Sequence, residues 1–454
     1  MSSSSGLQAD VRPREVWAWA MYDFANSGYT TVVVTAVFNA YFVSVVAAGK
    51  SWGTFAWASA LSISYAIIIF SAPVIGAYAD AHAAKKKLLA ITTSGCVLGT
   101  ALLSLVGPGD LTLAFALIVL SNVFFGTGEN IAAAFLPELA KGEAMGKVSA
   151  WGWSLGYIGG LLTLAVCLAY VFWARSVGHV EAQYVPVTML ITAAMFALAS
   201  SFTFLVLKER ARPVPADKGT ALRALARVGQ TLRHAARYQD LLRFLGCIVL
   251  YQSGVQIVIA LAAIYAQQAM GFTTQDTIVL VLLVNITASL GAYLFGQWQD
   301  RLGHRRTLML TLLGWCSMVL IAYLSTDKMG FWVAANIAGL CMGASQSAGR
   351  ALVGYLAPAD RHAEFFGLWG LAVKLASILG PLSYGALTWI TNNNHRAAIL
   401  VTGMSFVHGL VVLASADPER GRRAATAASR STSSRRGITR FQLRLGFAAG
   451  FGAS

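Results

Sequence analysis

Long apolar runs, separated by short polar segments, recur along nearly the whole chain. A helix that crosses a membrane needs about 20 mostly apolar residues, because the hydrocarbon core is about 30 Å thick. Twelve runs are long and apolar enough, and they cover residues 16–46, 54–79, 88–106, 111–136, 148–173, 184–207, 242–268, 277–298, 307–325, 331–355, 365–390 and 397–415. The pattern therefore predicts an all-α membrane protein with twelve transmembrane helices.

The polar segments divide the chain into five parts. They are a cytoplasmic N-terminal segment, a six-helix bundle, a basic linker, a second six-helix bundle and a tail, with bounds at 1–15, 16–207, 208–240, 241–415 and 416–454. Leu222, Leu225, Val228 and Leu232 recur in the linker at helical spacing between arginines, which favours an amphipathic helix on the membrane surface. A nucleic-acid or regulatory lipid site in the linker is the less favoured alternative. The Ser/Arg-rich tail has the composition of a disordered segment.

Composition and charge exclude a water-soluble protein. Apolar residues make up 57% of the chain and charged residues 12%, with a mean hydropathy of +0.62. The net charge of +15 does not indicate a soluble nucleic-acid binder, because the cations lie between apolar runs. Of the 34 Lys and Arg, 28 fall in segments on one side of the predicted membrane, and the opposite side carries only Lys50, Arg175, Lys328 and Arg396. This asymmetry predicts a multi-pass protein of the cell (inner) membrane with both termini in the cytoplasm.

The two halves of the chain repeat a pattern of residues. Gly76, Asp80 and the pair Lys85-Lys86 return in the second half, in the same order and at the same spacing, as Gly296, Asp300 and the pair Arg305-Arg306. In the same way, Pro137, Glu143 and Gly146 return as Pro358, Glu364 and Gly367. Two bundles related by a parallel repeat are typical of transporters whose site lies at the interface between the repeats.

The loop of the second repeat resembles the loop motif of the major facilitator superfamily. The matching residues are Gly296, Asp300, Arg301, Gly303, Arg305 and Arg306. The first copy keeps Gly76 and Asp80 but has Ala81 and Ala83 where Arg and Gly usually stand. The resemblance implies that the complete copy acts in gating, as its carboxylate breaks and reforms contacts with arginines while the bundles rock.

A narrower resemblance rests on three further stretches. They are Trp19 to Ser27, Val148 to Gly160, and Glu364 to Pro381. These stretches are similar to the vacuole-effluxer-like family, bacterial relatives of the autophagy-related fungal vacuolar amino-acid effluxer. The resemblance implies efflux of amino acids or similar small polar solutes, with proton coupling as a further expectation. An acidic role in the seventh run is not carried over, because Gln252-Ser253-Gly254 stands where an Asn-Asp pair is expected.

Four charges stand inside the predicted helices: Asp23, Glu129, Arg350 and Lys374. Such charges usually face a cavity or each other, because they are costly in the hydrocarbon core. The superfamily resemblance implies that Asp23, Glu129 and Arg350 line a central cavity.

Two interpretations of these charges remain open. In one, ion pairs of Glu129 with Arg350 and of Asp23 with Lys374 latch the bundles together. In the other, Asp23 takes up a proton or a substrate ammonium group, and Arg350 or Lys374 binds a substrate carboxylate. Asn26 shares the helix face of Asp23, and the weaker polar candidates are Gln256 and Gln346.

No enzyme is expected. Gly152-Trp-Ser154-Leu-Gly156 fits the nucleophile-elbow pattern but lies within an apolar helix, where the glycines favour close helix packing instead. The five cysteines and seven histidines show no disulfide or metal spacing, so no cofactor is expected. The predicted function is a secondary transporter working by alternating access, with a small-molecule substrate, protons and the lipid bilayer as partners and no nucleic acid or obligatory protein partner. The alternatives are a sugar, drug or metabolite carrier of the same fold, and a receptor or sensor that does not transport.

Overall fold

The computed structural model describes residues 7–8, 10–140, 142–210, 239–356, 362–417 and 419–423. Apart from one bridge between Leu7 and Ala140, the regular structure in these ranges is helical. The longer helices are α1 (Pro13–Tyr29), α3 (Gly53–His82), α4 (Lys85–Leu102), α5 (Leu111–Ala133), α7 (Gly142–Ser176), α8 (Glu181–Val206), α10 (Gln239–Met270), α11 (Thr274–Leu302), α12 (His304–Leu324), α13 (Lys328–Leu356), α14 (His362–Ile390) and α15 (His395–Ser415). The predicted amphipathic linker helix and the predicted disordered tail lie almost wholly outside the described residues.

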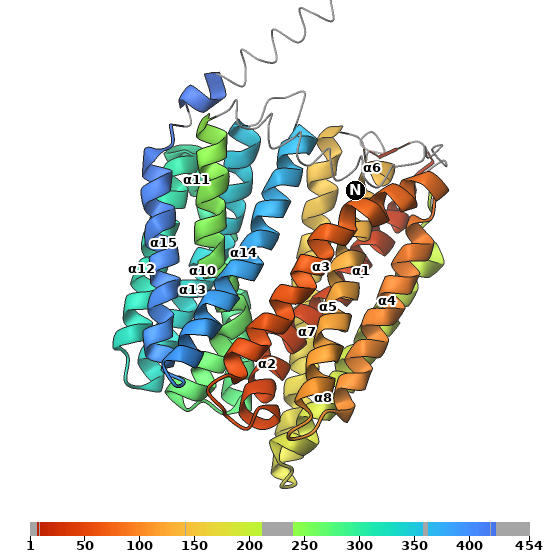
Figure 1. The fold of residues 1–454 in the computed structure, drawn as a ribbon. Coiled ribbons are helices and arrows are strands. Elements are labelled where there is room, and N and C mark those ends of the chain that lie inside the picture. The colour runs from red at the N-terminus through yellow and green to blue at the C-terminus, as the bar shows by residue number, and fades with distance from the viewer. Residues whose placement is uncertain are drawn as a thin grey trace, which may run out of the picture.

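The helices form two groups. Helices α1 to α8 lie together in one group, here called the N bundle, and α10 to α15 form the other, the C bundle (Figure 1). Across their interface α14 packs against α3, and α7 packs against α11. Helix α11 holds the place in the second repeat that α3 holds in the first, and α14 corresponds to α7 in the same way. These are the paired contacts that two bundles related by the predicted repeat would make.

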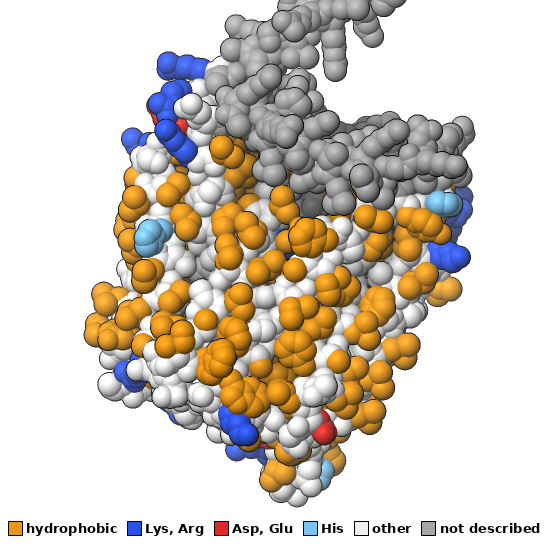
Figure 2. All heavy atoms as spheres, viewed as in Figure 1, with side chains coloured by type: hydrophobic (Ala, Val, Ile, Leu, Met, Phe, Trp, Pro, Cys, Tyr) orange, Lys and Arg blue, Asp and Glu red, His pale blue; other side chains and the backbone are white. Residues whose placement is uncertain are grey.

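Eleven spans in the described residues are long and apolar enough to cross a membrane, one fewer than the sequence predicted. The predicted run at 331–355 is the helix α13, which is 29 residues long but is not among the eleven. Polar side chains within it, such as Asn336, Ser345 and Gln346, lower its hydropathy. Exposed apolar side chains cover the middle of the molecule, while Lys and Arg gather toward its ends (Figure 2). This surface is that of a protein that spans a membrane.

The first predicted helix, 16–46, is not one α-helix. Helix α1 is followed by a π-helical segment η2 (Thr30–Ala36), the single turn α2 (Phe38–Tyr41) and a second π-helical segment η3 (Phe42–Val46). Residues 30–35 are all threonine or valine, and β-branched side chains crowd the preceding turn of an α-helix. Buried Asn39 donates from Nδ2 to the carbonyl of Thr35 at 3.0 Å and to that of Ala260 in α10 at 3.1 Å.

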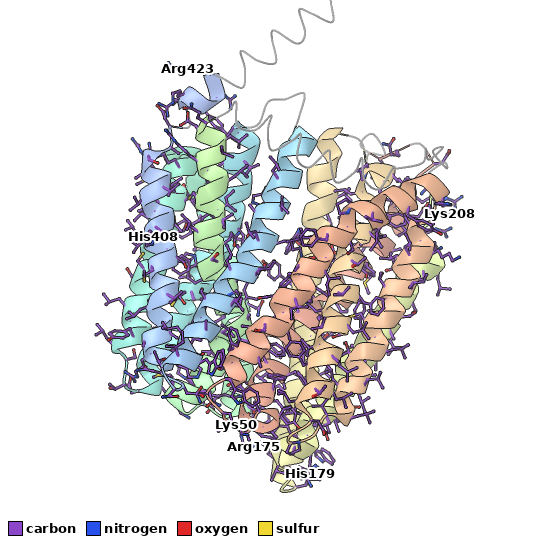
Figure 3. All side chains as sticks on the ribbon, viewed as in Figure 1. Lys50, Arg175, His179, Lys208, His408 and Arg423 are labelled. Carbon is purple, nitrogen blue, oxygen red and sulfur yellow. The ribbon has the colours of Figure 1, made fainter. Side chains whose placement is uncertain are left out.

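The two bundles make polar contacts across their interface at one end of the molecule, here called the closed end. There Asn393 donates to the carbonyl of Gly49 at 2.8 Å, and Arg175 donates to Gln275 at 3.1 Å. Thr274 also donates to Glu181, and Phe55 stacks on Trp389 with ring centroids 5.0 Å apart. Lys50 and Arg175 mark the closed end in Figure 3, and Lys208 and Arg423 mark the opposite end, the linker end.

At the linker end, an ion pair joins the segment that follows the last helix of each bundle to the first helix of the same bundle. In the N bundle, Arg210 Nη1 lies 2.9 Å from the buried carboxylate of Glu15 in α1. In the C bundle, Arg420 donates through Nε and Nη2 to both carboxylate oxygens of Asp240, at 2.7 and 2.6 Å. Two parallel bonds of this kind are the strongest form of an arginine–carboxylate contact.

Candidate functional site

A cavity of about 1130 Å³ lies between the two bundles. Its wall comes from α1, η2, α3, α5 and α7 of the N bundle and from α10 to α15 of the C bundle, and most of it is apolar. The lining extends to Leu136 in the short helix α6 (Leu136–Leu139), which lies at the linker end (Figure 1). The cavity therefore extends toward the linker end, whereas the cross-bundle contacts seal the opposite end.

An ion pair crosses the cavity from one bundle to the other. Lys374 Nζ in α14 lies 3.3 Å from Glu129 Oε2 in α5, and it also lies 5.3 Å from the ring centroid of Tyr65. Both charged side chains keep access to the cavity, because 24% of the Lys374 side chain and 42% of that of Glu129 are exposed. The long lysine stem spans the gap between α14 and α5.

The ion pair is not one of the two in the latch interpretation drawn from the sequence. That interpretation pairs Lys374 with Asp23, whereas in the structure Lys374 pairs with Glu129. The other expected pair, Glu129 with Arg350, cannot be compared, because the Arg350 side chain lies outside the described part of the structure. Sequence spacing gives the depth of each charge in its helix but not the distance between helices of different bundles, which decides the partner.

Asp23 lies on the cavity wall where α1 packs against α7. A methyl group at Gly152 would collide with Asp23 Oδ2, and one at Gly156 would lie 2.9 Å from Ser27 Oγ. The close helix packing predicted for these glycines is therefore confirmed, and it positions the Asp23 carboxylate against the backbone of α7. Asp23 has no ion-pair partner among the described side chains.

The two carboxylates of the N bundle lie on the same wall. A methyl group at Gly128 in α5 would lie 2.5 Å from the hydroxyl of Tyr22 in α1, so the two helices are in direct contact there. Asp23 and Glu129 are the next residues along each helix, and both line the cavity. The cavity wall of the N bundle therefore carries two neighbouring acids.

The three amides predicted from the sequence also line the cavity. Asn26 is 6% exposed, lines the cavity, and its Oδ1 has no hydrogen-bond partner among the described groups. Gln256 and Gln346 line the opposite wall, in α10 and α13. Gln346 Oε1 accepts a hydrogen bond of 2.9 Å from buried Gln252 Nε2. In the sequence, Gln252 stands out only as a departure from a family pattern. The feature that could have indicated its supporting role is a polar side chain within an apolar run.

The predicted gating loops lie at the linker end, and none of their described residues lines the cavity. Gly303 has φ +81° just before α12, a conformation that suits glycine, and Ala83 adopts φ +47° at the matching position of the first copy. Arg305 donates to the carbonyl of Ala414 at 2.6 Å, while Arg306 follows it in α12 and Gly76 lies in α3. The side chains of Asp80, Asp300 and Arg301, like Gly296, lie outside the described part, so the gating role stays a prediction.

The model of the family described as "Vacuole effluxer Atg22 like" matches residues 42–426. An uncharacterized MFS-type transporter YxiO of Bacillus subtilis is 27% identical over 413 residues, which cover 87% of this chain and 93% of that protein. The autophagy-related protein 22 of Saccharomyces cerevisiae strain S288c is 24% identical over 208 residues. That match covers 43% of this chain and 39% of the yeast protein, so the chain aligns with well under half of the yeast relative.

Two solved structures show the same fold. The nucleoside transporter NupG superposes with a TM-score of 0.66 at 14% identity, over 89% of this chain and 98% of that chain. A D-xylose-proton symporter gives a TM-score of 0.67 at 15% identity, over 88% of this chain and 96% of that chain. At these identities the likeness establishes the arrangement of helices and leaves the substrate open.

Proposed function

Because the chain belongs to the vacuole effluxer Atg22-like family and is a membrane transporter of the major facilitator type, we propose that it is a secondary transporter that moves amino acids or similar small polar solutes by alternating access. The observation that carries this proposal is the cavity between the bundles, which is sealed at the closed end and extends to the linker end. A site at the interface of two repeats can face one side of the membrane and then the other when the bundles rock.

Asp23 is the proposed proton site. It lies on the cavity wall without an ion-pair partner among the described side chains, so it is the described acid best placed to exchange a proton with the cavity. Intramembrane acids in transporters commonly serve in this way. Proton coupling would let a gradient across the membrane drive accumulation of the solute.

The test is transport by the full chain purified into proteoliposomes. The vesicles are offered radiolabelled amino acids of each side-chain class, a sugar and a nucleoside, with and without an imposed proton gradient. We expect uptake of at least one amino acid, stimulated by the gradient. Uptake confined to the sugar or the nucleoside would contradict the proposed substrate class, and binding without any uptake would identify a receptor rather than a carrier.

The membrane orientation gives a second prediction. Lys50 at the closed end and Lys208 at the linker end are each replaced by cysteine in a background without native cysteines (Figure 3). The distribution of Lys and Arg predicts that an impermeant thiol reagent added to intact cells labels the residue at 50 and not the one at 208. Permeabilised cells should show labelling at both positions. The reverse pattern in intact cells would overturn the proposed cytoplasmic location of both termini.

A third prediction concerns the packing of Asp23 against α7. Gly152→Ala places a methyl group on the Asp23 carboxylate, which must turn away from its position on the cavity wall. We expect uptake to fall by about tenfold or more, because small displacements at a site can cost about a hundredfold in rate. The matched control is Gly246→Ala in α10, where an added methyl group has no neighbour within 4 Å. Equal uptake by the two variants, at equal protein levels, would show that Asp23 need not be held there.

A further inference from the structure

The described charged groups of the cavity are divided by sign between the two bundles. The N bundle contributes the carboxylates of Asp23 and Glu129 and the unpartnered Oδ1 of Asn26, all of which accept hydrogen bonds. The C bundle contributes the ammonium group of Lys374. It also contributes the Gln346 carboxamide, whose oxygen is occupied by Gln252 so that its NH₂ group remains to donate. The N-bundle wall of the cavity therefore carries the described anionic groups, and the C-bundle wall carries the described cation.

The geometry of the ion pair that joins the two walls favours its replacement by contacts with a solute. Its N–O distance of 3.3 Å is longer than the roughly 2.7–2.9 Å of a strong charge-assisted hydrogen bond. Glu129 is 42% exposed to the cavity, so a solute can reach it directly. Lys374 also lies over the ring of Tyr65, a contact that stabilises its charge whichever carboxylate it binds.

We propose, on the basis of the proposed transport function, that this cavity binds a zwitterionic solute in one orientation, by inserting it into the Glu129–Lys374 ion pair. The solute's ammonium group lies against Asp23, Glu129 and Asn26 of the N bundle. Its carboxylate lies against Lys374 and Gln346 of the C bundle. The solute then replaces a direct contact between the bundles with one through itself, and its apolar part lies against the apolar lining of the cavity.

Orientation across the interface has a consequence for specificity. A solute with only an amine satisfies the N bundle and leaves Lys374 to compete for Glu129. A solute with only a carboxylate brings its charge to Lys374 but leaves the displaced Glu129 without a cation. Because each one-pole solute can form only one of the two charged contacts, it should bind more weakly than the zwitterion that carries both poles.

The experiment is competition against radiolabelled phenylalanine bound to the purified full-length protein. The competitors are phenylalanine, phenethylamine, which lacks the carboxylate, and 3-phenyllactate, which carries a hydroxyl in place of the amine. For the wild type we expect each one-pole compound to compete on the order of tenfold to a hundredfold more weakly than phenylalanine.

The variants assign each pole to its bundle. In Lys374→Gln, the affinity for phenylalanine should fall to that for phenethylamine, while the affinity for phenethylamine stays at least as high as in the wild type. In the double variant with Asp23→Asn and Glu129→Gln, the affinity for phenylalanine should instead fall to that for 3-phenyllactate. Substitution of a residue that only stabilises the fold would weaken the binding of all three compounds by the same factor. For these variants, binding is measured by the effect of each unlabelled compound on thermal unfolding, so that weak tracer binding does not hide the result.

Three outcomes would overturn the proposal. They are equal competition by the three compounds in the wild type, the opposite assignment of poles in the variants, and uniform weakening. Failure of all three compounds to bind a protein that transports only the sugar or the nucleoside in the proteoliposome screen would also overturn it, while the carrier function stands. Absence of uptake of any solute would instead contradict the proposed function itself.

Discussion

Lys374→Gln is expected to reduce uptake by about a hundredfold and to lower the stability of the protein by about 1 kcal/mol. The loss of uptake follows because Lys374 is the described cation of the cavity, and removal of one partner of a site that pairs charges costs about 2–5 kcal/mol in binding. The stability loss is smaller, because Glu129 is 42% exposed and water can solvate it after the lysine is gone. Initial uptake rates in proteoliposomes and thermal unfolding in detergent measure the two effects separately.

The matched control is Lys328→Gln. Lys328 also pairs with a carboxylate, Asp276 Oδ2 at 3.1 Å, but at the closed end within the C bundle and outside the cavity. Its loss should leave uptake within about twofold, as expected for an exposed ion pair. Adding Glu129→Gln to Lys374→Gln should restore stability without restoring uptake. If the double variant transports at the wild-type rate, the pair is only a latch between the bundles, which is the first of the two interpretations drawn from the sequence.

Gly343→Ala should have the largest effect on folding. The α11 and α13 backbones touch at this point, and a methyl group at Gly343 would collide with the carbonyl of Ala288. The reverse contact is made by Gly291, where a methyl group would collide with the carbonyl of Leu340. Neither backbone can move without separating the helices, so we expect a loss of about 3 kcal/mol or more. Thermal unfolding and the yield of monodisperse protein in detergent measure this loss.

Gly367→Ala in α14 is the control for a helical glycine without a close neighbour, since no atom lies within 4 Å of the added methyl group. It should be neutral or slightly stabilising, because alanine favours a helix by up to about 1 kcal/mol over glycine. If the Gly343→Ala variant unfolds at the same temperature as the Gly367→Ala variant, α11 and α13 can separate at little cost in stability. The close contact would then not be a main source of stability in the C bundle.

The apolar runs predicted most helices because their length is set by the membrane, whatever their neighbours. The same reasoning missed the break in the first helix, although its cause, six consecutive β-branched residues at 30–35, stands in the sequence. A long apolar run hides such a break, because π-helical and α-helical segments have the same hydropathy. In α13 the hydropathy misleads in the other direction. Polar side chains lower the hydropathy of this helix, although it packs with α11 and α12 as part of the C bundle.

The candidate site was only partly predictable for a different reason. The cost of a charge in the membrane identified Asp23, Glu129 and Lys374 one at a time, and all three line the cavity. Their arrangement depends on the angle between the bundles, which no residue spacing records. The support of Asp23 by Gly152 and of Gln346 by Gln252 also arises between helices, so it became visible only when the helices were packed.

The ion pairs at the linker end bring the two ends of each bundle together. Glu15 lies in the first turn of α1 and Arg210 follows α8, while Asp240 lies in the first turn of α10 and Arg420 follows α15. Each bundle is thus a chain segment closed on itself by one charged contact, and neither closure uses a residue of the other bundle. Two halves synthesised as separate polypeptides would each retain both ends of their own closure, and they could meet in the membrane through the interface alone.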